Sequence, residues 1–192
     1  MSLAEQKFDE GMELSEIPYG HEEAILKFTE AIELNPNYAK AYEKRGDCYN
    51  LWLRAYNAKL AISDYTQAIK LTTDDKKLAD LYHARAEAYV ELENYEQAIK
   101  DLTQSIKLDP KNASYYRWRG RIYFKSGSYF DSGSYSAAIS DFTKAIQLDP
   151  FGELYLFRGL AYNELGEVEH AILDIKKALE LKREKPDAVW RL

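Results

Sequence analysis

The sequence predicts an all-α solenoid in which antiparallel helix pairs stack one after another, and three observations support this prediction. One short pattern of small and bulky apolar residues at helical spacing occurs five times in the 192 residues. A second helical pattern precedes its copies. Helix-favouring Ala, Leu, Lys and Glu are abundant, whereas the chain has only five prolines and nine glycines. Because a stack of repeats is continuous, we expect a single solenoid over residues 1–192.

The five-copy pattern places two small residues seven positions apart, with a bulky apolar residue four positions after the first. Its clearest copy has Ala138, Phe142 and Ala145, followed by Pro150. These spacings lie on one face of a helix, where small residues admit a neighbouring helix and the bulky residue fills the remaining space. Proline then ends the helix because it lacks an N–H. The other copies contain Ala24, Phe28, Ala31 and Pro36; Ala61, Tyr65 and Ala68; Ala98, Leu102, Ser105 and Pro110; and Ala171, Ile175 and Ala178.

The helix before each copy has its own pattern, in which two tyrosines seven residues apart flank an arginine and a small residue. The segment YYRWRGRIY shows it with Tyr116, Arg119, Gly120 and Tyr123. The small residue lets the partner helix approach closely, at the modest cost that glycine has in helices. Three further copies contain Tyr42, Arg45, Gly46 and Tyr49; Tyr82, Arg85, Ala86 and Tyr89; and Tyr155, Arg158, Gly159 and Tyr162. The first repeat keeps only Gly11 and Leu14.

A Tyr-x2-Arg-Gly-x2-Tyr helix, a short turn and an Ala-x3-Phe-x2-Ala-x4-Pro helix together resemble the tetratricopeptide repeat (TPR) family. Its repeat is a helix–turn–helix unit of about 34 residues. The resemblance covers nearly the whole chain and implies a right-handed superhelix of about ten helices. We expect repeats 1 to 5 near residues 4–37, 38–74, 78–111, 112–151 and 152–185, with residues 186–192 as a C-terminal cap or a truncated next helix.

The repeats differ in length, and the extra residues can be located in the sequence. In repeat 2, LWLRAYNAKL holds about three extra residues that form helices well, so we expect its first helix to gain roughly one turn. The connector TTDDKKLAD is also about three residues longer than the others. In repeat 4, Ser126–Asp131 is partly duplicated at Ser132–Tyr135, and its Gly and Ser residues predict a protruding loop.

Composition argues against several functions. A net charge of −6 and a pI near 5.2 disfavour binding of nucleic acids or anionic membranes by the whole chain. Cys48 is the only cysteine, so no internal disulfide can form and a reducing compartment is expected. The N-terminal MSLAEQKFDE lacks the apolar region of a signal peptide, and no apolar run is long enough to span a membrane. We therefore expect a cytoplasmic protein.

No residues with catalytic or metal-binding spacing stand out. His21, His83 and His170 fall in different repeats, so we expect each to be solvated or paired locally. Cys48 lies inside a predicted first helix with no histidine nearby, which favours a structural thiol over a nucleophile. The glycine-containing segment of repeat 4 lacks the lysine of a phosphate-binding loop. We expect no enzymatic activity, no cofactor and no metal ion.

The resemblance implies that the first helices line the concave side of the solenoid, and one part of that side is rich in basic and aromatic residues. Arginine and aromatic side chains are enriched at binding hot spots, and arginine can hold a carboxylate through two hydrogen bonds. The alternative is that Trp118 and Phe157 pack between adjacent helices. The predicted binding patch consists of Arg117, Trp118, Arg121, Phe124, Lys125, Leu156 and Phe157.

The sequence therefore predicts a non-enzymatic scaffold or adaptor that holds a peptide or helix with acidic and apolar residues in its groove. Some TPR proteins bind chaperone C-terminal carboxylates, but Lys44, Asp80 and Ala84 stand where that clamp needs Asn, Lys and Arg. One alternative is self-association through Trp52, Tyr56 or Trp190. A weaker alternative is RNA binding through the segment RWRGR, which the acidic net charge disfavours.

Overall fold

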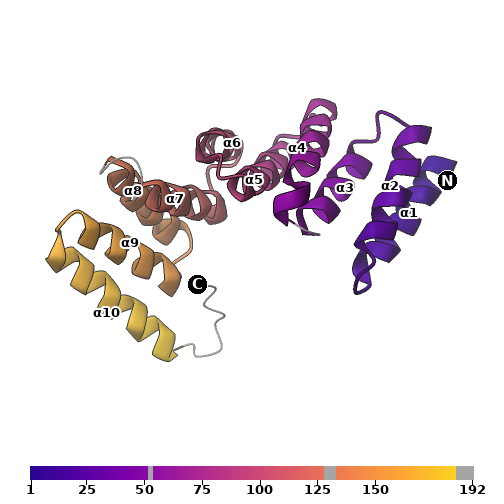
Figure 1. Cartoon of the computed structure of the whole chain (residues 1–192). Helices are drawn as coiled ribbons and strands as arrows, with labels where there is room; N and C mark the ends of the chain where they lie inside the picture. Colours follow the sequence, from indigo (N-terminus) through magenta and orange to yellow (C-terminus); the bar gives the residue numbers. More distant parts are fainter. Residues whose placement is uncertain (52–53, 128–132, 185–192) are drawn as a thin grey trace. The chain divides into compact units, whose positions relative to one another are not determined.

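A computed structural model describes residues 1–51, 54–127 and 133–184, which form α-helices and contain no strand. This confirms the predicted all-α fold (Figure 1). The helices, in order, are α1 (Leu3–Glu16), α2 (His21–Leu34), α3 (Ala39–Leu51), α4 (Arg54–Leu71), α5 (Asp75–Glu91), α6 (Tyr95–Leu108), α7 (Ala113–Gly127), α8 (Gly133–Leu148), α9 (Gly152–Glu164) and α10 (Val168–Glu184).

The helices pack as five consecutive pairs, α1 with α2 through α9 with α10, and each pair is one repeat. The chain divides into two compact units, Met1–Leu108 with three pairs and Asp109–Leu192 with two. Within a unit, the second helix of one repeat packs on the first helix of the next: α2 on α3, α4 on α5, and α8 on α9. The single continuous solenoid over residues 1–192 stays a prediction.

The two recurring patterns form the core between paired helices. In repeat 4, Ala138, Phe142 and Ala145 are fully buried. A Cβ atom on Gly120 of α7 would lie 2.9 Å from the Phe142 ring, so glycine is needed for the close approach. Repeat 3 has Ala86 at the glycine position and the smaller Leu102 opposite, both buried. The size of the residue on one helix is therefore matched to its neighbour on the other.

The structure corrects the expected position of one insertion and shows the conformation of another. In repeat 2 the first helix, α3, has 13 residues, and the second helix, α4, has 18, so the extra turn lies in α4 and the predicted lengthening of the first helix was wrong. The residues in excess after α4 are also helical. Asp74 caps α5, its side chain accepting a hydrogen bond from the Lys77 amide at 2.8 Å, and α5 reaches 17 residues. An aspartate at the cap favours this early start.

Two predictions concern residues outside the described ranges. Of the duplicated segment in repeat 4, Ser126 and Gly127 end α7 and Gly133–Tyr135 begin α8, whereas the predicted protruding loop would fall mainly on residues 128–132, which are not described. The predicted cap at residues 186–192 and the side chains of Trp52 and Trp190 also lie outside. Within the described ranges, no helix is long and apolar enough to cross a bilayer.

Candidate functional site

The seven residues of the binding patch come from α7 and α9, two first helices of the second unit that contact one another. The same contact between successive first helices occurs in the first unit, where α3 touches both α1 and α5. First helices therefore share one face within each unit. On α7, Lys125 is exposed, and the other patch residues of both helices are half-buried.

Arg121 lies at the centre of the patch. Its guanidinium carbon lies 5.5 Å from the centroid of the Trp118 ring and 5.2 Å from that of Phe157. These distances suit cation–π attraction. An Nη1 atom of Arg121 also lies 3.4 Å from Oε1 of the buried Glu153. Arg121 thus links α7 to α9 and fixes the position of both aromatic rings.

Phe124 and Phe157 belong to the packing between helices. Phe157 of α9 stacks on Phe142 of α8, with ring centroids 5.9 Å apart, and meets Phe124 edge to face at 6.0 Å. Phe124 also meets Tyr135 at 5.7 Å. For Phe157, the geometry agrees with the alternative of packing between adjacent helices. These two rings give the patch an apolar floor.

Arg117, one turn before Arg121, differs from the other arginines of α7 and α9. Its Nη2 donates to the Ser114 hydroxyl at 3.3 Å. Its Nε is buried and has no acceptor among the described residues. Arg119, Arg121 and Arg158 instead each lie beside a carboxylate: Asp141, Glu153 and Asp174, respectively.

Arg117 also lines a cavity of about 530 Å³ where the start of α7, the end of α8 and the start of α9 meet. Sequence reasoning named Arg117 but missed most other side chains of the wall. A signal was present, because the Asp-Pro connectors at residues 109–110 and 149–150 lead into successive first helices. The side chains missed include those of Lys111, Asn112, Leu148, Asp149, Phe151 and Leu154.

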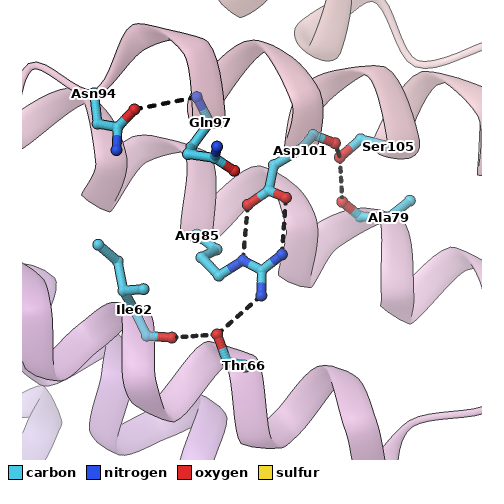
Figure 2. A network of polar contacts seen from close by, with 8 residues as sticks. All are labelled: Ile62, Thr66, Ala79, Arg85, Asn94, Gln97, Asp101 and Ser105. Carbon is cyan, nitrogen blue, oxygen red and sulfur yellow. Dashed lines mark hydrogen bonds and ion pairs between the residues drawn. The ribbon is translucent and has the colours of Figure 1, made fainter.

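The arginine of the tyrosine pattern has a structural role that the sequence analysis did not assign (Figure 2). Arg85 donates to both carboxylate oxygens of Asp101, at 2.7 and 2.8 Å. Its Nη1 donates to the hydroxyl of Thr66, in the preceding repeat, at 2.9 Å, and that hydroxyl donates to the Ile62 carbonyl. One guanidinium therefore joins both helices of its own repeat to the repeat before it.

This arrangement recurs, and we name it the arginine ladder. Arg45 binds Asp64 and Thr29, and Arg158 binds Asp174 and Thr143 in the same geometry. Arg119 makes the same paired bonds to Asp141, and these bonds raise the pKa of its guanidinium despite burial. The carboxylates are buried, so the ladder residues hold the repeats together rather than face a partner.

The cysteine and histidines do not form a site with one another in the described part of the chain. Cys48 is buried, and burial, with a smaller contribution from the Asp47 charge, raises the pKa of its thiol to about 11. His83 lies 3.8 Å from Glu87, and His170 lies 3.0 Å from Glu167. Among the described residues, no three His, Cys, Asp or Glu side chains are arranged to hold a metal ion.

Comparison with protein families gives two matches in succession along the chain. A family described as TPR repeat matches residues 86–127, and a family described as tetratricopeptide repeat matches residues 128–189. The chain is a tetratricopeptide repeat protein. This confirms the resemblance seen in the tyrosine and alanine patterns. No match was found among curated proteins.

This chain has the same fold as several solved structures of TPR proteins. MamA protein is 25% identical over 98% of this chain and 97% of its own, with a TM-score of 0.82. MamA from Desulfovibrio magneticus is 18% identical over 95% of this chain and 96% of its own, with a TM-score of 0.80. YrrB, a TPR protein with an unusual peptide-binding site, is 21% identical over 96% of this chain and 88% of its own, with a TM-score of 0.75. These likenesses extend over the whole helical repeat array.

Proposed function

We propose that this TPR protein is a non-enzymatic interaction scaffold that binds a peptide or helix of a partner protein on the α7–α9 face. Membership of the TPR family supports an interaction role, and the solved structure of YrrB is of a TPR protein with a peptide-binding site. The observation that carries the proposal is the binding patch, where Arg121 holds Trp118 and Phe157 in place beside the cavity-lining Arg117.

The charge of this region favours an acidic partner. Residues 111–125, which include most of α7, contain five basic residues and no acidic one. Residues 109–192 carry 13 basic and 12 acidic residues, whereas residues 1–108 carry 13 basic and 20 acidic residues. The α7 segment is thus a basic stretch in an otherwise acidic protein, and opposite charge would steer a partner toward it.

Peptide selection followed by mutation tests this proposal. Random 12-residue peptides displayed on phage are selected on the whole chain, and their dissociation constants are measured for the wild type and for Trp118→Ala. Loss of a hot-spot side chain costs about 2 kcal/mol or more, so we expect binding at least roughly 30-fold weaker. Circular dichroism of Trp118→Ala should show the same helix content as the wild type.

Lys144→Ala is the control, because Lys144 is exposed on α8 and belongs to neither the patch nor the cavity wall. It should bind the selected peptides as the wild type does. If no peptide is enriched, or if Trp118→Ala binds them as tightly as the wild type, the proposal is wrong. A fall in melting temperature with a general loss of binding would instead place Trp118 in the core.

A second candidate is self-association, which exposed apolar side chains favour. Tyr56 is 85% exposed, and α10 exposes Val168, Ile172, Leu173 and Leu179. Light scattering over a range of concentrations separates the two functions, because a monomer at every concentration would rule out self-association. RNA binding through RWRGR is less favoured, since Arg119 and Arg121 already lie beside carboxylates. We also propose a cytoplasmic location, consistent with the single buried cysteine.

A further inference from the structure

The cavity at the start of α7 has the size and composition of a binding site. Its volume of about 530 Å³ lies in the range of pockets that hold small ligands or side chains. One part of the wall is polar and comes from Lys111, Ser114 and Arg117. Another part of the wall is apolar and includes Leu148 and Leu154, from α8 and α9. A ligand group with a charged end and an apolar stem would fit both parts.

Arg117 indicates which charged group the cavity accepts. Its guanidinium stays charged, but its only hydrogen bond among the described residues is from Nη2 to the Ser114 hydroxyl at 3.3 Å. The Nε–H is buried without an acceptor, although buried donors are nearly always satisfied. An acceptor from outside the chain would satisfy it, and a carboxylate can accept from Nε and an Nη together.

We propose that this cavity binds the carboxylate side chain of an aspartate or glutamate of the partner, with Arg117 as the main cation. The inference rests on the proposed function and names the chemistry that the scaffold recognises. Lys111 supplies a second positive charge, and Leu148, Phe151 and Leu154 contact the apolar stem and the residue beside it. Asp149 also lines the cavity, so the wall carries one net positive charge, which matches a singly charged carboxylate.

The carboxylate comes from a side chain rather than from the end of a chain. A terminal carboxylate is commonly held by unpaired backbone N–H groups. Here the Lys111 amide already donates to the Asp109 side chain at 3.3 Å, and the Ser114 amide donates to the Asn112 side chain at 3.0 Å. The Asn112 amide likewise donates to the Asp109 carbonyl at 3.4 Å, and the charged donors of the cavity wall are the side chains of Arg117 and Lys111.

Three N-acetylated tripeptides test the inference. The first, acetyl-Leu-Glu-Leu-amide, offers only a side-chain carboxylate. The second replaces Glu by Gln and has no carboxylate, and the third is the Gln peptide with a free C-terminal carboxylate. Each is titrated into the whole chain to about 10 mM, because a single contact of this kind binds weakly. The readout is the Nε–H signal of Arg117 in a ¹⁵N–¹H NMR spectrum, assigned by its disappearance in Arg117→Lys.

We expect the Glu peptide to shift the Arg117 signal in a saturable way and to bind at least tenfold more tightly than the other two peptides. Arg117→Lys, followed through the backbone amide signal of Ser114 because the Arg117 signal is lost, should bind the Glu peptide more weakly, since lysine keeps the charge but loses the paired donors. Lys144→Ala should bind it as the wild type does. Equal binding of the Glu and Gln peptides would overturn the inference, and so would a shift that does not saturate.

Other outcomes separate this inference from the proposed function. If the peptide with the free C-terminus binds best, the cavity is a site for a chain end, and the inference is wrong. If none of the tripeptides moves the Arg117 signal but peptides selected by display still lose affinity with Trp118→Ala, the cavity inference fails and the scaffold function stands. If neither result is obtained, both proposals fail.

Discussion

Repeat 1 and repeat 3 place opposite charges at the same two positions. In repeat 3 the residue before the small one is Arg85, and the residue three positions after the first alanine is Asp101. The equivalent residues in repeat 1 are Glu10 and Lys27, so the charges are exchanged. Arg85 and Asp101 form two short hydrogen bonds in a buried setting, whereas Lys27 reaches one oxygen of Glu10 at 3.1 Å.

The two ion pairs also differ in their neighbours. Glu10 and Lys27 belong to a partly exposed group of four charges with Lys7 and Glu30, and hydrogen bonds from Lys7 and Lys27 hold the pKa of Glu10 below its usual value. Arg85 has a third bond, to Thr66 of the preceding repeat. Glu10 instead pairs with two lysines of its own repeat, Lys7 and Lys27.

The contrast extends to the outer face of the first helices. On α3, Ala41 and Cys48 are buried five positions before and two positions after the glycine. The equivalent residues of α1, Gln6 and Glu13, are polar and exposed. A helix that packs on a preceding repeat needs apolar side chains and an arginine there, whereas α1 carries residues that suit water. The arginine thus serves the contact between repeats as well as its own pair.

Removing the acid from each ion pair should give the largest difference in stability between the two repeats. Asp101→Ala leaves the partly buried Arg85 without its carboxylate, and we expect the free energy of unfolding to fall by about 3 kcal/mol. Glu10→Ala removes a partly exposed partner, so its unfolding midpoint should stay close to that of the wild type. Urea denaturation followed by circular dichroism measures both variants. Equal losses in the free energy of unfolding would show that the two ion pairs stabilise the fold equally.

The small residue between the tyrosine positions offers a second test. In repeat 1 a Cβ on Gly11 would lie 2.7 Å from the buried Phe28 ring, whereas repeat 3 has Ala86 opposite Leu102. Gly11→Ala should cost about 1–2 kcal/mol, since overpacking of about 1–3 kcal/mol outweighs the better helix propensity of alanine. The double variant Gly11→Ala with Phe28→Leu copies repeat 3 and should recover part of that loss in urea. If the double variant is less stable than Gly11→Ala alone, the sizes of the two facing residues are not matched in the way proposed.

Removing the hydrogen bond between Arg85 and Thr66, which joins two repeats, should have the smallest effect on the free energy of unfolding. Thr66→Val keeps the side-chain shape but removes the acceptor for Arg85 Nη1, and we expect a loss of about 1 kcal/mol in the free energy of unfolding. Thr73→Val, at an exposed position after α4, serves as the control. An effect of Thr66→Val no larger than that of the control would mean that the ladder bond does not stabilise the contact between repeats.

Local patterns in the sequence predicted the helices, the repeats and the family, because each pattern lies within one helix and its spacing sets the buried face. Ala138, Phe142 and Ala145 illustrate this, and all three are buried as predicted. The ladder was missed although its residues are visible. Arg85 and Asp101 lie on different helices, 16 residues apart, and an aspartate within a helix resembles an ordinary solvated residue.

Part of the candidate site could also not be predicted from the sequence. Arg117 and Trp118 could be named from the helical pattern, but the cavity needs the ends of three helices to meet, and Leu148 and Phe151 lie at connectors whose path the pattern does not specify. The extra turn of repeat 2 was assigned to α3 instead of α4, and the helical start of the connector before α5 was not foreseen, for a related reason. The residue count fixes the length of an insertion but not which helix includes it, and at α5 the cap at Asp74 sets where the helix begins.

The most direct test of the whole account is the affinity of a display-selected acidic peptide for Arg117→Met, measured together with the unfolding midpoint in urea. Arg117 has no carboxylate partner among the described residues and takes no part in the ladder. The account predicts binding at least tenfold weaker with an unchanged midpoint, in contrast to Asp101→Ala, which should unfold more easily. An unchanged affinity, or a midpoint that falls as far as that of Asp101→Ala, would contradict it.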